Sequence, residues 1–117
     1  PMDYERAQTS DFLKGNPRFL EPNITANLAI TDKFRAYAGD HGLPTASLAI
    51  AWLLAQGEQV LPIPGTRSVE HLKELVKGCE IELTAQMSQE IEELLPIGWA
   101  HGDRYSAAQW IGPERYC

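Results

Sequence analysis

Residues Gly65, Thr66 and Arg67 stand where an apolar segment ends and a helical pattern begins, and their chemistry suits an anion. A loop that leads from a buried strand into a helix offers free backbone N–H groups and the positive end of the helix dipole. Glycine lets the backbone approach a ligand closely, threonine adds a hydroxyl donor, and arginine presents a planar, permanently charged fork. These three residues therefore predict a phosphate-binding loop.

Two further side chains could extend this loop into a nucleotide site. Arg67, His71 and Glu74 follow the spacing i, i+4, i+7, so they share one side if helical geometry extends back to Arg67. The arginine would then bind a phosphate, and the Glu74 carboxylate would receive an adenine amino group. In the alternative interpretation, Arg67 only pairs with Glu70 or Glu74 on a solvated face. The spacing alone leaves both interpretations open.

The elements that must position the loop are mostly helical. Apolar residues at helical spacing, interrupted by glycines, predict four helices at about residues 25–39, 46–56, 69–77 and 85–95. The expected N-caps of the last three helices are Thr45, Ser68 and Thr84. Val69, Leu72 and Val76 are expected to form the inner face of the third helix. The second helix is apolar almost all round, which is typical of a helix that is buried on all sides.

A single short strand is predicted at residues 59–63, directly before the loop. A buried backbone group without a hydrogen-bond partner costs on the order of 1–3 kcal/mol, so a strand needs a neighbour. The sequence contains no second strand of matching length. Either the strand pairs with another copy of the chain, or it is the end of a longer α/β protein, which is the interpretation we favour.

The remaining segments are irregular. Residues 1–23 are expected to be a surface loop and residues 97–117 an irregular tail, with the whole of 1–117 forming one partial domain.

Composition excludes several classes of protein. The net charge is −6, which is the opposite of what a nucleic-acid-binding protein usually carries. The longest apolar run, residues 48–55, is far shorter than the ~20 residues that span a bilayer. Cys79 and Cys117 form no metal-binding spacing and are interpreted as reduced thiols. We therefore expect a soluble, cytoplasmic protein with no metal, nucleic-acid or membrane partner.

Three segments resemble the aldo-keto reductase superfamily, whose members are NADP(H)-dependent (β/α)8 barrels. The stretch WLLAQGEQVLPIPGTRSVEHLKEL is similar to the family's passage from a helix through the eighth strand into the cofactor loop. RFLEPNITANL resembles an upstream loop and helix entry with asparagines at positions 23 and 27, and IELTAQMSQEIEEL resembles the last helix. The resemblance covers about residues 17–96. It implies the α/β class and a C-terminal fragment of a TIM barrel that retains one barrel strand near 59–63.

The resemblance also implies a cofactor and the residues that bind it. Gly65, Thr66 and Arg67 would hold the 2′-phosphate of NADP(H), and Glu74 would receive the adenine amino group. His71 stands where the family usually has an arginine, and an imidazole is neutral at pH 7 unless it is perturbed. Leu75 replaces an asparagine that contacts adenine. The preference for NADP(H) over NAD(H) therefore rests mainly on Arg67.

The catalytic residues that the family uses have no counterpart in this sequence. The family's tyrosine acid and its supporting lysine, histidine and aspartate lie on earlier strands, and no stretch here matches those motifs. The resemblance implies that the tail overhangs the substrate pocket, so a substrate-facing role for Trp99, His101 or Tyr105 is an alternative to loop packing, which we favour. We predict that the complete enzyme reduces aldehydes or ketones to alcohols by hydride transfer and that these 117 residues alone do not. The alternative is a non-catalytic, self-associating helical module in which the Gly-Thr-Arg loop is a relic.

Overall fold

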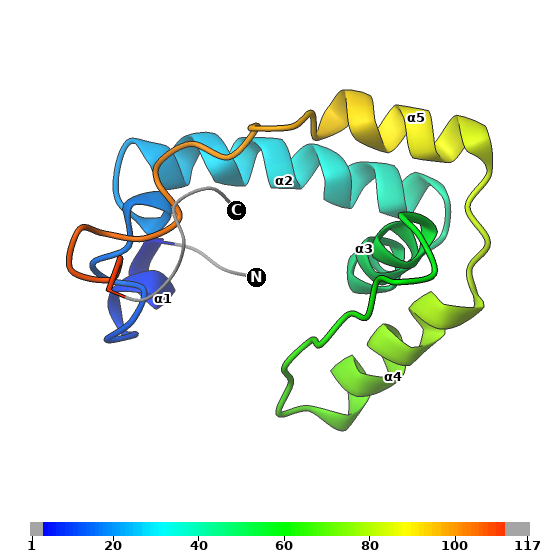
Figure 1. Cartoon of the computed structure of the whole chain (residues 1–117), viewed down its shortest axis with the longest axis horizontal. Helices are drawn as coiled ribbons and strands as arrows, with labels where there is room; N and C mark the ends of the chain where they lie inside the picture. Colours follow the sequence, from blue (N-terminus) through cyan, green and yellow to red (C-terminus); the bar gives the residue numbers. More distant parts are fainter. Residues whose placement is uncertain (1–3, 112–117) are drawn as a thin grey trace. The chain divides into compact units, whose positions relative to one another are not determined.

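Helices are the regular secondary structure of residues 4–111, and irregular segments connect them. The computed structural model describes residues 4–111 (Figure 1). Its helices are α1 (Tyr4–Gln8), α2 (Asn23–Asp40), α3 (Thr45–Ala55), α4 (Val69–Lys77) and α5 (Ala85–Leu94), with 3-10 turns η1 (Pro17–Phe19) and η2 (Gly78–Glu80). The four predicted helices are thus confirmed as α2 to α5. The N-terminal segment, residues 1–23, was expected to be a surface loop, and its described part contains α1 and η1. Cys117, which was interpreted as a reduced thiol, lies outside the described residues.

The chain divides into two compact units. One comprises the described residues up to Asp32 together with those from Ile97 onward, and the other comprises Lys33–Pro96. The first is called unit 1 and the second unit 2. The predicted cofactor residues all belong to unit 2. No helix within residues 4–111 is long and apolar enough to span a membrane.

Two of the three predicted N-caps are confirmed. The Ser68 hydroxyl accepts the backbone N–H of His71 at 3.3 Å, and the Thr84 hydroxyl accepts that of Met87 at 3.1 Å. The prediction for Thr45 is wrong. The N-cap of α3 is Pro44, whose ψ of 136° is extended, so helical geometry begins only after it.

The core of unit 2 joins three helices. Phe34 and Ala38 of α2 pack with Leu48 of α3 and Ile91 of α5, and half-buried side chains such as Trp52 surround this cluster. Leu48 is fully buried. The expectation that α3 is buried on all sides holds only for its N-terminal half. Its buried residues lie between Ser47 and Ala51, whereas Leu53 and Leu54 are each 36% exposed in the described chain.

A hydrogen bond and a close approach fix α4 and η2 against α3. The fully buried Ser47 hydroxyl donates to the carbonyl oxygen of Glu74 at 2.6 Å. At Gly78, an added Cβ would lie 2.6 Å from the Ser47 carbonyl oxygen and 2.7 Å from the Ile50 Cβ. Only glycine allows this approach, and the contact determines where α4, and therefore the loop before it, is held.

Replacing Gly78 with alanine should destabilise the protein. The new methyl group would overlap backbone and a β-branched side chain, and overpacking of this kind costs about 1–3 kcal/mol. The measurement is the free energy of unfolding in urea. Gly39→Ala is the matched control, because Gly39 lies in α2 with nothing within 4 Å of an added Cβ. That variant should be stabilised by up to about 1 kcal/mol. Equal effects of the two substitutions would contradict the packing argument.

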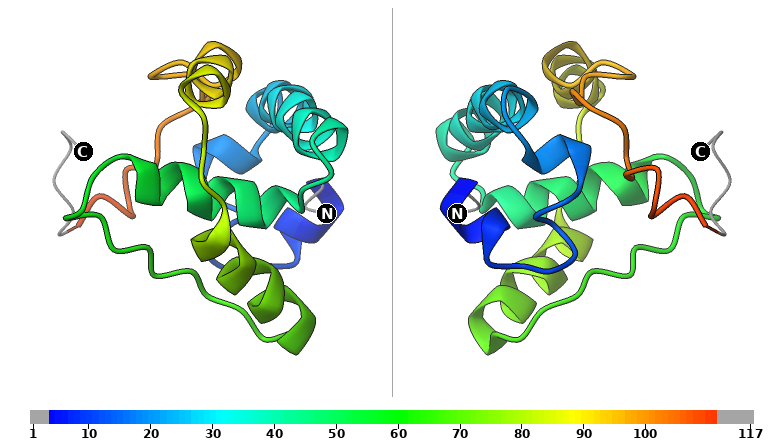
Figure 2. Two further views of the ribbon diagram at one scale, coloured as in Figure 1. Left: turned by 90° about the vertical axis from the view of Figure 1, so that its right-hand side faces the viewer. Right: turned by 90° about the vertical axis from the view of Figure 1, so that its left-hand side faces the viewer.

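The strand predicted at residues 59–63 is not formed within residues 4–111. These residues belong to an irregular link between α3 and α4, which Figure 2 draws without an arrow. A strand is defined by pairing, and this link has no partner strand in the described part of the chain. The side chains of Leu61 and Ile63 are 84% and 90% exposed instead of buried.

The predicted inner face of α4 is also exposed. Val69, Leu72 and Val76 retain 64%, 51% and 55% of their accessible surface, so the expectation that they face inward is wrong for the described chain. Their helical spacing correctly marks one apolar side, but nothing within residues 4–111 covers it. We use the name open apolar face of unit 2 for these three side chains and the exposed side chains of Leu61 and Ile63 on the link.

Three asparagines, which we call the asparagine clamp (Asn16, Asn23 and Asn27), hold unit 1 together. The Asn27 side chain bonds to both backbone groups of His101, accepting from the N–H at 2.8 Å and donating to the carbonyl oxygen at 3.0 Å. The buried Asn16 amide donates to the Arg104 carbonyl oxygen at 2.6 Å. The described part of the tail is therefore fixed to the N-terminal segment.

A glycine makes the third contact of the clamp possible. The Asn23 amide donates to the Pro17 carbonyl oxygen at 3.0 Å. Gly102 packs against the same two groups, with an added Cβ only 2.7 Å from the Asn23 nitrogen, and its φ is +85°. A residue with a side chain would be strained here both by contact and by backbone conformation.

Candidate functional site

The loop Gly65–Thr66–Arg67 is exposed and open to a ligand. All three residues lie at the surface, and nothing lies within 4 Å of a Cβ built on Gly65. Within residues 4–111, none of their three consecutive backbone N–H groups donates a hydrogen bond. Consecutive free N–H groups just ahead of a helix are the main elements of a backbone anion site.

The hydroxyl groups beside the loop are already engaged. The Thr66 hydroxyl donates to the Ser68 carbonyl oxygen at 3.3 Å and accepts the Ser68 N–H at 3.2 Å. The Ser68 hydroxyl donates to the Glu70 carboxylate at 2.9 Å. These bonds stabilise the turn into α4, so backbone N–H groups and Arg67 remain as the donors available to an anion.

Arg67 has no hydrogen-bond or ion-pair partner in the described part of the chain. In particular, Glu70 and Glu74 do not pair with it, as the alternative interpretation required. A guanidinium group that is free at the surface is available to a phosphate.

Glu70 occupies the N-terminus of α4. A hydrogen bond from its own backbone N–H, followed by the bond from Ser68, lowers the pKa of its carboxyl group. Glu70 is therefore anionic at neutral pH and already complements the helix dipole. A bound phosphate is consequently expected at the Gly65–Arg67 side of the turn rather than on the helix axis.

His71 and Glu74 share one side of α4, because they are three residues apart in a regular helix. The condition for adding Arg67 to that side is not met. Ser68 is extended, with φ −118° and ψ 132°, so helical geometry does not reach back to Arg67. Arg67 therefore lies in the loop, whereas His71 and Glu74 lie together on α4. Glu74 is itself held in place through its carbonyl oxygen by Ser47.

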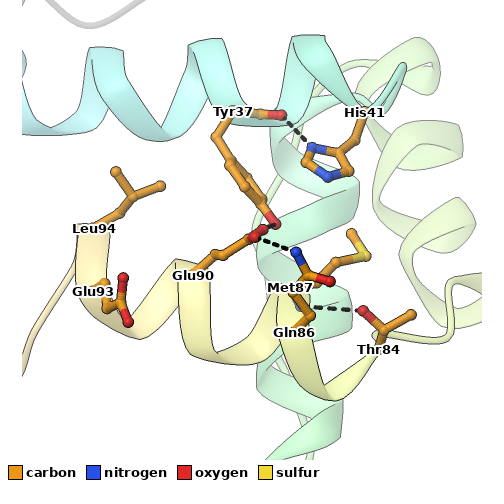
Figure 3. Close-up of a pocket in the computed structure, with 8 residues that line it drawn as sticks. All are labelled: Tyr37, His41, Thr84, Gln86, Met87, Glu90, Glu93 and Leu94. Carbon is orange, nitrogen blue, oxygen red and sulfur yellow. Dashed lines mark hydrogen bonds between the residues drawn. The ribbon is translucent and has the colours of Figure 1, made fainter.

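A second polar cluster lies in unit 2, in an open groove of about 690 Å³ between α2 and α5 (Figure 3). The Tyr37 hydroxyl donates to the Glu90 carboxylate at 2.7 Å, and Gln86 donates to the other carboxylate oxygen. The His41 ring packs against the Tyr37 ring at an angle of 40°, with centroids 4.3 Å apart. The i, i+4 spacing of Tyr37 and His41 is a sequence signal that could have indicated this contact.

The groove is not built for acid catalysis. Partial burial, followed by the hydrogen bond and negative charge of Glu90, raises the pKa of Tyr37 to about 12. A general acid at neutral pH needs a pKa near 7, so this shift is in the wrong direction. The hydrogen bonds from Tyr37 and then Gln86 lower the pKa of Glu90. The cluster is best explained as a link between α2 and α5.

Replacing Glu90 with glutamine should lower the pKa of Tyr37 part of the way toward its ordinary value of 10.0. The negative charge is lost while burial remains. The measurement is an alkaline titration of the Tyr37 ring resonances by NMR. Glu93→Gln is the control, because Glu93 lines the same groove but bonds to Gln89 instead. An equal shift in both variants would contradict a specific Tyr37–Glu90 interaction.

The link also makes stability depend on pH at both ends of the scale. The pKa of Tyr37 is raised in the folded state, so its contribution is present below pH 10 and is lost as the pH rises through about 12. The pKa of Glu90 is lowered, so its contribution is present above the ordinary value of 4.5 and is lost as the pH falls through the lowered value.

Three side chains of the tail, those of Trp99, His101 and Tyr105, have different surroundings in unit 1. Trp99 lines a small cavity, whereas the exposed His101 is bound through its backbone by Asn27. Tyr105 packs edge-on against Phe12 and Trp110, at centroid distances of 6.4 and 5.3 Å. The described contacts of Tyr105 are thus those of loop packing.

Comparison with known proteins gives consistent matches. The sequence profile described as "Aldo/keto reductase family" matches residues 2–96. "Probable aldo-keto reductase 1" from Glycine max is 38% identical over 101 residues, which are 86% of this chain and 29% of that protein. "Aldo-keto reductase yakc [NADP(+)]" from Schizosaccharomyces pombe is 35% identical over 95 residues, 81% of this chain and 28% of that protein. The chain thus spans less than a third of these curated relatives. No solved structure matches it.

Proposed function

Because this chain belongs to the aldo/keto reductase family, we propose that it is the C-terminal, cofactor-binding part of an NADP(H)-dependent reductase. In this proposal the complete protein reduces an aldehyde or ketone to an alcohol, with the hydride supplied by the bound nicotinamide. The residues described here bind the adenosine end of the cofactor, and no catalytic residue is assigned to them.

The observation that carries the proposal is the free anion-binding loop. Three consecutive unused N–H groups and an unpaired guanidinium follow one another at Gly65, Thr66 and Arg67. The 2′-phosphate of NADP(H) has the charge and the oxygen acceptors that such donors match. NAD(H) lacks this phosphate, so the loop would discriminate between the two cofactors. The printed name of the Schizosaccharomyces pombe relative, which includes NADP(+), supports the same choice.

The open apolar face of unit 2 fits this assignment. Leu61 and Ile63 on the link, together with Val69, Leu72 and Val76 on α4, are the side chains that a strand and its following helix would bury in a barrel. We propose that the rest of a TIM barrel covers them in the complete protein. His71 and Glu74 remain proposed contacts to the adenosine part of the cofactor.

Oxidation of NADPH tests whether the catalytic residues lie outside these 117 residues. The 117-residue chain is mixed with NADPH and a panel of aldehydes, and the loss of NADPH absorbance is followed. No sustained oxidation is expected from the chain alone, whereas the complete protein should reduce at least one aldehyde. Turnover by the isolated chain would mean that its own residues include a catalytic set, which would overturn the proposed division.

The open apolar face also supports a second candidate function, a non-catalytic module that self-associates. Exposed apolar surface of this kind favours association in water. Analytical ultracentrifugation distinguishes the two candidates when it is combined with cofactor binding. A dimer that fails to bind NADP(H) would favour the module, and a monomer that binds it would favour the reductase fragment.

A further inference from the structure

Unit 1 contains a small apolar cavity that the cofactor assignment does not use. The cavity has a volume of about 210 Å³ and lies between η1, the start of α2 and the tail. Its apolar lining comes from Phe19, Ile24, Leu28 and Trp99. For comparison, an apolar cavity of about 150 Å³ accommodates benzene, so a ligand with one aromatic ring fits this volume.

One charged group lines the same cavity. Arg18 donates from Nε to the Gly102 carbonyl oxygen at 3.3 Å, which orients its guanidinium group. Its terminal nitrogens have no partner within residues 4–111. A guanidinium group with free terminal N–H groups pairs with a carboxylate through two parallel hydrogen bonds. The cavity therefore combines an apolar interior with one cation, the usual composition of a site that orients a small ligand.

The wall formed by the tail is fixed before any ligand arrives. Asn27, which also lines the cavity, bonds to both backbone groups of His101 and to the Arg18 carbonyl oxygen. These bonds hold Trp99 and Ala100, the cavity residues just before His101, in one position. A preformed wall reduces the entropy that a ligand loses on binding.

We infer that this cavity of unit 1 is a binding site for a small aromatic carboxylate. The ring would lie among Phe19, Ile24, Leu28 and Trp99, and the carboxylate would pair with the terminal nitrogens of Arg18. The site does not depend on the proposed cofactor loop, because all its residues belong to unit 1.

The test compares benzoate with benzamide, its neutral counterpart, in NMR titrations of the 117-residue chain. The methyl resonances of Ile24 and Leu28 report occupancy of the cavity. Benzoate should shift them and bind at least about tenfold more tightly than benzamide, the factor expected for a lost charge-assisted hydrogen bond. Equal affinities, or shifts that do not involve these methyl groups, would overturn the inference.

Three variants separate the contribution of the Arg18 charge from that of the cavity shape. Arg18→Gln should abolish the preference for benzoate over benzamide, whereas Arg104→Gln, which removes the same charge outside the cavity, should preserve it. Asn27→Ala should weaken both ligands alike, because it frees the wall without removing the cation. A preference that survives Arg18→Gln, in a variant whose spectrum shows that it is folded, would contradict the assigned role of Arg18.

Discussion

Replacing Arg67 with alanine should weaken the binding of NADP(H) to the complete protein by about 5- to 150-fold and leave NAD(H) almost unaffected. The range corresponds to about 1–3 kcal/mol for the loss of a charge-assisted contact. Arg67 is exposed and has no partner within residues 4–111, so its removal breaks no described contact and should not disturb the fold. The measurement is the dissociation constant of each cofactor by fluorescence titration.

Two controls sharpen this prediction. Lys73→Ala removes one positive charge from the exposed side of α4, the helix that follows the loop, and should change neither constant by more than about twofold. Arg67→Lys keeps the charge but loses the planar fork, so its effect should be intermediate. If Arg67→Ala weakened both cofactors equally, the assignment of the 2′-phosphate to this loop would fail.

The largest loss of stability is expected for Leu48→Ala. Leu48 is fully buried where α2, α3 and α5 meet, and removing a leucine side chain from such a site costs about 2–5 kcal/mol. Leu61→Ala makes the same chemical change at a side chain that is 84% exposed, and should alter stability by no more than about 0.5 kcal/mol. Urea unfolding followed by circular dichroism measures both.

The difference in stability between these two variants tests the core that is described for unit 2. A similar urea midpoint for Leu48→Ala and Leu61→Ala would mean that Leu48 is not at the centre of a packed core. An unchanged dependence on urea concentration, with a lower midpoint for Leu48→Ala alone, is the result that the packing predicts.

The helices were predictable because their signals are local. Apolar spacing, capping hydroxyl groups at Ser68 and Thr84, and the glycine that ends α4 act within one or two turns of chain. The N-cap of α3 was predicted one residue too late, at Thr45, because Pro44 already has the extended geometry of an N-cap. Errors of this size arise at helix boundaries because two neighbouring residues can both serve as the N-cap.

Features that depend on distant parts of the chain were not predictable. A strand requires a partner, so the composition of residues 59–63 could not by itself decide whether a strand forms. The Asn27 side chain bonds to a residue 74 positions away, and the Asn16 side chain to one 88 positions away. The sequence showed both asparagines of the RFLEPNITANL segment but not the tail that Asn27 holds.

The candidate site was predictable in composition and only partly in geometry. Gly65, Thr66 and Arg67 form an exposed loop before α4, as expected. The hydroxyl groups of Thr66 and Ser68 are engaged within the turn, an arrangement that the Ser-x-Glu pattern at residues 68–70 could have indicated. The extended conformation of Ser68 is what keeps Arg67 off the helical side shared by His71 and Glu74.

The most direct test of the phosphate-binding loop is an NMR titration of the chain with adenosine 2′,5′-bisphosphate and, separately, adenosine 5′-phosphate. The two ligands differ only in the phosphate that the loop is proposed to recognise. If the loop recognises the 2′-phosphate, the bisphosphate should shift the backbone amide resonances of Gly65, Thr66 and Arg67, and the monophosphate should bind at least about fivefold more weakly. Amide shifts elsewhere, or the same affinity for both nucleotides, would contradict it.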